Sequence, residues 1–216
     1  MTTTCTKPEL LLRQLYFIIG ICITAVGAAV FVLTGTGTDP FGMLMQGVAK
    51  TFGISNGMAH ISINAAYILI ILLVDRKYIR IGTFIALFVT GPMIDFASSL
   101  LRIFINDSLP YYVRLGITLL SCLVIGFGLA CVINASVGMG ANDLISVIIS
   151  DKMRFQFRWV RIVVDATMVV IGYLLGGTIG LGTIACALLI GPTAQFYMPY
   201  SGRILYKITR RFAYND

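Results

Sequence analysis

Aspartate and asparagine side chains occur inside the most apolar stretches of this chain of 216 residues. Asp95 lies three residues after a Gly-Pro pair, Asn64 lies in an earlier apolar stretch, and Asp165 lies in a later one. A charged residue at the centre of a membrane-spanning helix costs about 2.5–3.5 kcal/mol on insertion scales, so such residues usually face a cavity or a partner. Together these three side chains offer the chemistry of binding a cation, a proton or a cationic solute.

Other polar side chains inside or beside the apolar stretches widen this set of candidates. His60 is the single histidine, and it is either a proton relay or a hydrogen-bonded interfacial residue. Arg161 is either an anchor for an anionic solute or an arginine that extends to the lipid headgroups, and the second role is the commoner one. Aspartate and asparagine at the start of a helix commonly cap its free amide groups, a role that competes here with ligand binding. The remaining candidates for a solute or ion site are Asp39, Asn142, Asp143 and Gln195.

No set of residues in the sequence resembles a catalytic or metal-binding site. One histidine is too few for a usual metal site, and the cysteines form no Cys-X-X-Cys pair. No serine or cysteine stands in a nucleophile motif, and Gly35, Gly37 and Gly42 do not make the Gly-X-Gly-X-X-Gly pattern of dinucleotide binding. We therefore expect no enzyme activity, no cofactor and no metal.

The composition places these residues in a membrane. The chain is 58% hydrophobic and 12% charged, with a mean hydropathy of +0.92, which excludes a soluble domain. About 20 apolar residues cross the hydrocarbon core, and lipid satisfies no backbone polar groups, so the apolar stretches are expected to be helices. The sequence predicts an all-α membrane protein with six transmembrane helices, at 15–33, 58–74, 81–101, 115–133, 160–175 and 179–197.

The basic residues predict how these helices are oriented. The net charge is +7, and thirteen of the sixteen lysines and arginines fall on one side of the membrane if both termini lie in the cytoplasm. Cytoplasmic loops carry an excess of basic residues, so the distribution favours this orientation over a role in binding nucleic acid. We expect cytoplasmic N- and C-termini and contact with membrane lipid.

A motif of glycine, threonine and proline occurs twice, 100 residues apart. The first copy is Gly82-Thr83 with Gly91-Pro92, and the second is Gly182-Thr183 with Gly191-Pro192. Glycine lets a neighbouring helix approach closely, whereas proline removes a backbone donor and kinks or breaks a helix. The motif therefore predicts a helix break with free carbonyl groups beside Asp95, and a role in helix packing alone is the alternative.

Polar residues also align between the two halves, at an offset of 100 or 101 residues. His60 aligns with Arg161, Asn64 with Asp165, and Asp95 with Gln195. Each copy holds three spans, and an odd number inverts the second copy in the membrane, as in many secondary transporters. The sequence predicts one transmembrane domain, 1–216, with repeat 1 at about 10–105, repeat 2 at about 110–205 and a basic cytoplasmic tail at 201–216.

One further segment follows the first span and another follows the fourth. Each is too apolar for an aqueous loop and too interrupted by glycine for a span. Both predict a glycine-rich turn and then a short amphipathic helix of roughly ten residues. Each short helix is either re-entrant or interfacial, and the inversion places one on each side of the membrane.

Several of these segments carry a family resemblance. They are Arg13 and GAAVF in the first span, then GTGTDPFGMLMQGVAK, GISNG and RKYIRIGTFIALFVTGPMIDF. In them the chain resembles the YczE/YyaS/YitT-like family of small bacterial integral membrane proteins. Family members usually read G-X-X-P-W-D where this chain has Phe41-Gly42 in place of Trp-Asp, and the second copy has Asp143 at the matching place. The resemblance implies a multi-pass protein of the bacterial cytoplasmic membrane and no particular substrate.

Three hypotheses for function follow from these residues. The first is a small secondary transporter or solute carrier with a site between the two repeats, for an unidentified small molecule or ion. The second is a substrate-binding subunit of a multi-component importer, which requires a partner membrane subunit. The third is a non-transporting accessory or regulatory membrane protein. The sequence is also compatible with a homo-oligomer.

Overall fold

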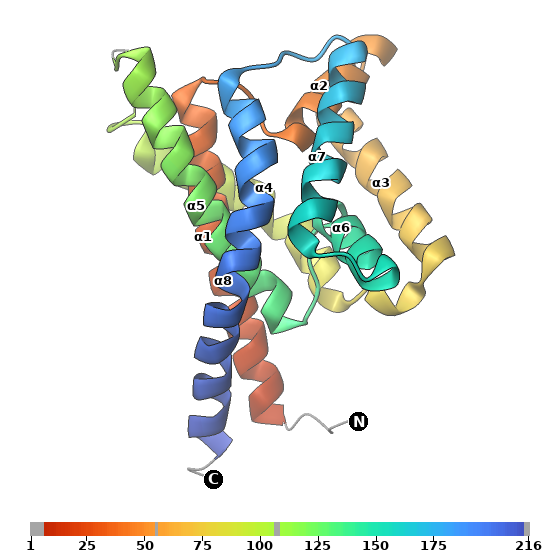
Figure 1. Ribbon diagram of the computed structural model, residues 1–216, viewed down its shortest axis with the longest axis vertical. Helices are drawn as coiled ribbons and strands as arrows, with labels where there is room; N and C mark the ends of the chain where they lie inside the picture. The colour runs from red at the N-terminus through yellow and green to blue at the C-terminus, as the bar shows by residue number, and fades with distance from the viewer. Residues whose placement is uncertain (1–6, 55, 106–108, 214–216) are drawn as a thin grey trace.

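The computed structural model describes residues 7–54, 56–105 and 109–213, and these residues are helical almost throughout, without a strand. Residues 214–216 of the expected basic tail lie outside the described residues. The described helices are α1 (Lys7–Thr34), α2 (Pro40–Phe52), α3 (Asn56–Val74), the 3-10 helix η1 (Arg76–Tyr78), α4 (Ile81–Leu101), α5 (Tyr111–Ala135), α6 (Ala141–Met153), α7 (Phe157–Leu174) and α8 (Leu181–Ala213). Figure 1 shows their arrangement.

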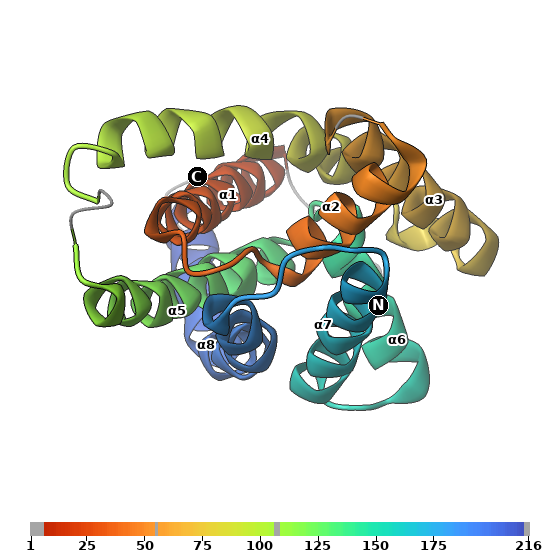
Figure 2. The same cartoon turned by 90° about the horizontal axis from the view of Figure 1, so that it is seen from above.

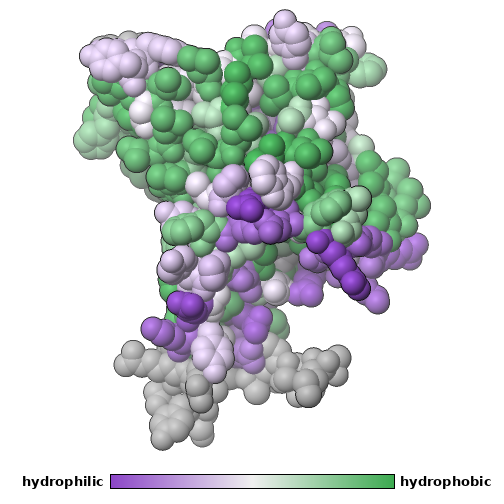
Figure 3. Space-filling view, in the orientation of Figure 1, coloured by the Kyte–Doolittle hydropathy of each residue, from purple (hydrophilic) through white to green (hydrophobic). Residues whose placement is uncertain are grey.

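Four of the described helices, α1, α4, α5 and α8, are long and apolar enough to cross a membrane by length and composition. The shorter apolar helix Met58–Val74 forms most of α3. Helix α7 has 18 residues, which include the charged residues Arg158, Arg161 and Asp165, and it is not among these four helices. The outer surface fits lipid, because large apolar side chains such as Phe84, Phe88 and Phe96 are exposed, and Figure 3 shows such side chains covering the upper part of the molecule. An all-α membrane protein is therefore confirmed.

The long helices α1, α5 and α8 pack together, and α4 packs on α1, as Figure 2 shows from above. Small residues let α1 and α5 approach closely, because a Cβ added to Gly27 would lie 2.7 Å from the side chain of Ile125. Tyr16 of α1 makes a buried hydrogen bond of 3.0 Å from its hydroxyl to the carbonyl oxygen of Ser201 in α8. Beyond this bond both helices continue to the lower end of Figure 1, where α1 begins and α8 ends. The segment expected as a basic tail is thus the last part of a helix of 33 residues.

The repeated Gly-Thr pairs join the two halves of the chain. The Gly82 amide at the start of α4 donates to the carbonyl oxygen of Val137 at 3.2 Å, and the Gly182 amide at the start of α8 donates to that of Thr36 at 3.1 Å. A Cβ on Gly82 would lie 2.8 Å from the Val137 carbonyl carbon, and one on Gly182 would lie 2.5 Å from the Thr36 hydroxyl oxygen. Only glycine fits these two positions without movement of the backbone or side chains opposite. We call these two contacts the glycine clasps.

The threonines of the two pairs differ in their hydrogen bonds. The Thr183 hydroxyl oxygen accepts the Thr38 amide at 3.2 Å and the Gly180 amide at 3.3 Å. The Thr83 hydroxyl is buried and has no hydrogen-bond partner among the described residues. Thr183 therefore orders the turn before α2, and Thr83 has no matching contact at the turn before α6.

The helix break expected at the Gly-Pro pairs is not found. Helix α4 continues from Ile81 to Leu101 through Pro92, and α8 continues through both Pro192 and Pro199. A proline inside a helix removes one amide donor, and membrane helices tolerate this loss better than aqueous ones do. The Gly-Pro pairs therefore do not break the helices. Gly191 has a role in helix packing, which is described below.

The two short segments form helices of 13 residues each, α2 and α6. Asp39 caps α2, because its carboxylate accepts the Gly42 amide at 3.2 Å, and Gly53 ends the helix at a φ of 63°. No side chain caps the start of α6, so Asn142 and Asp143 stand in its first turn without the capping role expected for them. The two helices thus begin differently although they follow corresponding turns.

Candidate functional site: a charged cavity between the two halves

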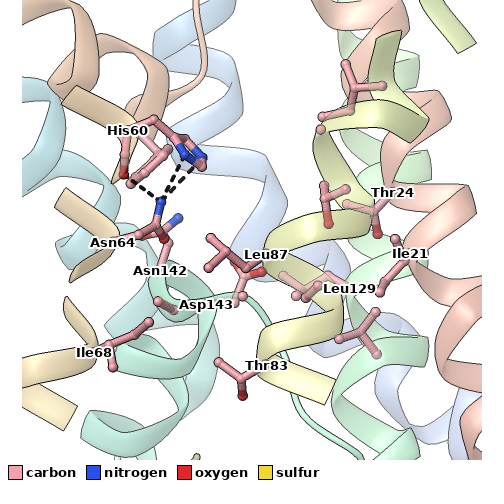
Figure 4. Close-up of a pocket in the computed structure, with 18 residues that line it drawn as sticks. Ile21, Thr24, His60, Asn64, Ile68, Thr83, Leu87, Leu129, Asn142 and Asp143 are labelled. Carbon is pink, nitrogen blue, oxygen red and sulfur yellow. Dashed lines mark hydrogen bonds between the residues drawn. The ribbon is translucent and has the colours of Figure 1, made fainter. Parts of the chain in front are cut away.

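An internal cavity of about 430 Å³ lies where the two halves of the chain meet, and an adjoining space of about 240 Å³ shares several of its walls. Side chains from both halves line them. The described structure brings together seven of the eight predicted ligand candidates there, namely Asp39, His60, Asn64, Asp95, Asn142, Asp143 and Asp165, together with Arg161. Figure 4 shows the smaller space between α3, α4 and α6. Residues more than 100 positions apart in sequence therefore meet at one place.

Arg161 is at the centre of the charged residues in the larger cavity. Its Nε donates to Asp165 Oδ2 at 2.9 Å, and its Nη1 donates to Asp143 Oδ1 at 2.5 Å. The four-residue spacing of Arg161 and Asp165 puts both on one face of α7, and the first turn of α6 supplies Asp143. The Arg161 side chain is 8% exposed, so the interpretation that it extends to the lipid headgroups is wrong. We call these three residues the arginine cluster.

Two oxygen atoms at the arginine cluster lack a hydrogen-bond partner among the described residues. One is Oδ1 of Asp165, whose side chain is 1% exposed, and the other is Oδ1 of Asn142, in the first turn of α6. A buried acceptor without a partner costs about 1–3 kcal/mol, and more when it is charged. Both atoms belong to residues that line the larger cavity, so a bound donor is their natural partner.

The charges around this cavity do not balance. Asp39, Asp143 and Asp165 line it together with one cation, Arg161, and Asp95 adds a fourth carboxylate from α4. Helices α2 and α6 both begin at the cavity, and the partial positive charge of a helix N-terminus offsets a part of this excess. When all four carboxylates are ionised, the cavity remains negative and favours a positively charged ligand.

The first half of the chain places a neutral pair where the second half has the arginine cluster. Asn64 Nδ2 lies 3.3 Å from the His60 ring nitrogen Nε2 and donates to the His60 carbonyl oxygen at 2.9 Å. The Phe41 ring meets the His60 ring edge-on, with 5.6 Å between ring centres. His60 and Asn64 are one helical turn apart in α3, as Arg161 and Asp165 are in α7. Figure 4 shows the pair beside Asn142 and Asp143 of α6.

Gln195 is the candidate that the structure places elsewhere. Its Oε1 accepts the Arg158 amide at 2.9 Å, at the start of α7. One turn earlier, a Cβ added to Gly191 would lie 2.9 Å from the Arg158 carbonyl oxygen, so α8 packs tightly on α7 here. Gln195 and Gly191 therefore hold two helices together.

The corresponding residues of α4 are uncovered. Gly91 has no atom within 4 Å of an added Cβ, and Gly91, Pro92 and Asp95 are all exposed. Helices α3 and α4 have no interface comparable to that of α7 and α8 among the described residues. Asp95 lines the larger cavity from this open side, and its side chain is exposed.

The arginine cluster could have been predicted from the spacing of its residues, although composition and position within the span do not indicate it. An arginine and an aspartate four residues apart in a helix are spaced for an ion pair, and such a pair inside a span indicates an internal site. Phe41 was also missed as a cavity residue, because a phenylalanine in an apolar segment gives no signal of its own.

The fold and the cavity define a helical membrane protein with an internal polar site. The chain belongs to the family of unknown function DUF6198, whose model matches residues 11–199. It is 30% identical to the uncharacterized membrane protein YczE of Bacillus subtilis over 210 residues, which cover 96% of this chain and 95% of that protein.

Two further relatives match over most of their length. The uncharacterized protein YyaS of Bacillus subtilis is 27% identical over 93% of this chain and 99% of its own, and an uncharacterized protein of Haemophilus influenzae is 26% identical over 84% of this chain and 81% of its own. No solved structure matches the chain. The predicted resemblance to YczE and YyaS is confirmed.

Proposed function

We propose that this protein is a small secondary transporter or solute carrier that binds a cation in the cavity between its two halves. The observation that carries the proposal is the unpartnered, buried Oδ1 of Asp165, next to the arginine cluster and inside a cavity that both halves enclose. A buried carboxylate oxygen without a donor is a costly arrangement that a transported cation or proton relieves. The proposal includes no enzyme activity and no cofactor.

The proposed architecture is six spans in two inverted repeats, with α3 and α7 completing the four longer helices. The glycine clasps support it, because each joins the first residues of α4 or α8 to the turn before the short helix of the opposite half. The turns before α2 and α6 also share a glycine at unusual φ, 147° at Gly37 and 155° at Gly138. In this scheme α2 and α6 are re-entrant helices that begin at the central site.

The proposed orientation puts both termini in the cytoplasm of a bacterial cell. The end of α3 lies close to the end of α6, since the Lys152 ammonium donates to the carbonyl oxygen of Val74 at 3.0 Å and the Tyr78 hydroxyl donates to Asp151 at 3.2 Å. Segments around these contacts are rich in basic residues, which supports a shared cytoplasmic side. Figure 3 shows hydrophilic side chains gathered toward the end of the molecule where both termini lie.

The difference between the helix pairs suggests how the carrier works. In the described state α7 is closed on α8 at Gly191, and α3 is apart from α4 at Gly91. If the halves are related by inversion, the α7–α8 interface and the α3–α4 interface face opposite sides of the membrane. Opening one interface while the other closes then gives alternating access to the cavity. The solute site at the arginine cluster stays between the two interfaces.

Measurement of charge movement tests this function without a known solute. The protein is reconstituted in liposomes on a solid-supported membrane and exposed to concentration jumps of inorganic cations, amines, amino acids and protons. A carrier gives saturable transient currents with one class of cation, and Asp165→Asn abolishes them while Asp151→Asn, an exposed carboxylate outside the cavity, retains them.

Two other results would replace the proposal. Currents that appear only after a partner protein is added to the liposomes indicate a subunit of a multi-component importer. No currents with any cation, from protein that remains folded, indicate the non-transporting accessory or regulatory protein.

A further inference from the structure

The chemistry of the free groups in the cavity limits the class of ligand, given the proposed function on which this inference rests. Arg161 is already bound to two carboxylates, so its charge is not free to bind an anion. The two unpartnered oxygens, on Asp165 and Asn142, are acceptors that need a donor. A ligand that brings N–H groups and a positive charge satisfies both atoms and reduces the excess negative charge.

A bare metal ion fits this site less well than an organic cation. A calcium ion takes six to eight oxygen ligands, and magnesium requires an octahedral set. No group of three histidine, cysteine or acidic side chains spaced for a metal ion occurs in the described part of the chain. Asp143 and Asp165 each have one oxygen bound to Arg161, so the site offers single oxygens from different elements.

Most of the remaining residues that line the cavity are apolar. Ile94, Ile125 and Leu129 line it, and Phe41 lines both spaces. Apolar walls with a few polar groups at one end are typical of sites for small organic molecules, and an aromatic ring attracts cations. The volume of about 430 Å³ lies within the usual range for such sites.

We propose that the cavity binds an organic ammonium ion, a protonated primary amine with an apolar body of about the size of a benzyl or cyclohexyl group. The ammonium donates hydrogen bonds to Oδ1 of Asp165 and Oδ1 of Asn142. The apolar body lies against Ile94, Ile125 and Leu129. The open side between α3 and α4, where Asp95 is exposed, is the entry to this site.

The test is equilibrium binding to the purified full-length protein in lipid nanodiscs. The probes are benzylammonium and cyclohexylammonium, with benzyl alcohol as the neutral control, benzoate as the anionic control, and sodium and magnesium chloride as inorganic controls. The two ammonium ions are expected to bind saturably and the controls to bind about tenfold more weakly or not at all.

Two cavity variants and one matched control locate the site. Asn142→Ala removes an oxygen that accepts no hydrogen bond among the described residues, so we expect it to leave the fold intact and to weaken ammonium binding by about tenfold. Asp165→Asn weakens binding at least as much. Asp151→Asn, which changes an exposed carboxylate outside the cavity, leaves binding unchanged. If Asp165→Asn does not fold, the Asn142→Ala result decides.

Each contrary result would overturn one element of the proposal: the class of ligand, the location of the site or the carrier function. If benzyl alcohol or benzoate binds as tightly as the amines, both the ammonium class and the cation specificity of the proposed carrier are wrong. If sodium or magnesium binds instead, the ammonium class is wrong and the proposal of a cation carrier stands. If the amines bind equally to wild type and Asn142→Ala, the location is wrong. If no probe binds to folded protein and the reconstituted protein also gives no currents, both the ligand class and the carrier function are wrong.

Discussion

The pairs α7–α8 and α3–α4 carry the same glycine-proline motif and use it differently. Gly191 brings α8 against the backbone of Arg158, and Gln195 fixes the contact with a hydrogen bond to the same residue. Gly91 has no neighbour, and Asp95, the residue that aligns with Gln195, is exposed. A glycine in a helix therefore marks the place where a partner can fit, and the sequence does not say whether the partner is there.

The chemistry of the two halves differs in the same way. Helix α7 holds the charged pair of Arg161 and Asp165, whereas α3 holds the neutral pair of His60 and Asn64. The half with the closed helix pair is also the half with the arginine cluster. The comparison suggests that the second half of the chain binds the ligand and that the first half forms its entry path.

The largest expected effect is the loss of the arginine cluster. Arg161→Ala leaves the Asp143 and Asp165 carboxylates without their buried partner, so we expect a loss of about 3–5 kcal/mol in the free energy of unfolding. The measurement is thermal or denaturant unfolding in detergent. His60→Ala in the first half is the matched variant and should lose about 1 kcal/mol or less, since it removes a neutral contact. Similar losses in both would contradict the difference in charge.

The glycine clasps should respond alike in the two halves. Gly82→Ala and Gly182→Ala each place a Cβ within 3 Å of an atom of the opposite half, at Val137 or Thr36. We expect each variant to lose about 2–3 kcal/mol, because overpacking forces the facing segments apart. Unfolding of both variants under one set of conditions checks this. A loss confined to one clasp would show that the halves are joined at one place only.

The motif glycines beyond the clasps should respond differently. Gly191→Ala inserts a methyl group 2.9 Å from the Arg158 carbonyl oxygen and should lose about 1–2 kcal/mol. Gly91→Ala meets open space and should gain up to about 1 kcal/mol, since alanine favours a helix more than glycine does. A strong loss at Gly91 would mean that the state in which α3 closes on α4 dominates in the membrane.

The smallest effect is expected at the two aligned polar residues. Gln195→Ala removes a hydrogen bond to the Arg158 amide and should lose about 0.5–1.5 kcal/mol. Asp95→Asn should change stability by no more than about 0.5 kcal/mol, because its side chain is exposed, and should slow ligand entry. Unfolding and the rate of amine binding are measured on the same two preparations. A large loss of stability in Asp95→Asn would indicate a structural role instead.

Much of the helical pattern could be predicted from the sequence. The predicted span 81–101 has the boundaries of α4, and α3 and α7 differ from the predicted spans by three residues or fewer at each end. Long apolar runs give a strong signal, because backbone groups in lipid must be satisfied within the helix. The same reasoning located seven of the polar residues that meet at the cavity.

The predictions failed where they depended on neighbours. Pro92 was expected to break a helix, and the local rule was outweighed by the need to keep backbone groups bonded within the span. Arg161 was expected to extend to the headgroups because it stands near the start of a span, but α6 brings Asp143 to it from another part of the chain. The separation of α3 from α4 has no signal in a sequence whose two motif copies are so alike.

The length of α8 has a practical consequence. A helix of 33 residues is about 50 Å long, whereas the hydrocarbon core is about 30 Å thick, so α8 is a rod longer than one crossing of the membrane needs. The bond between Tyr16 and Ser201 ties this rod to α1. A compact soluble protein fused to α8 through an uninterrupted helix would therefore keep a fixed direction relative to the bundle. Such a fusion gives a membrane protein of 23.5 kDa the extra mass and the visible landmark that single-particle electron microscopy needs.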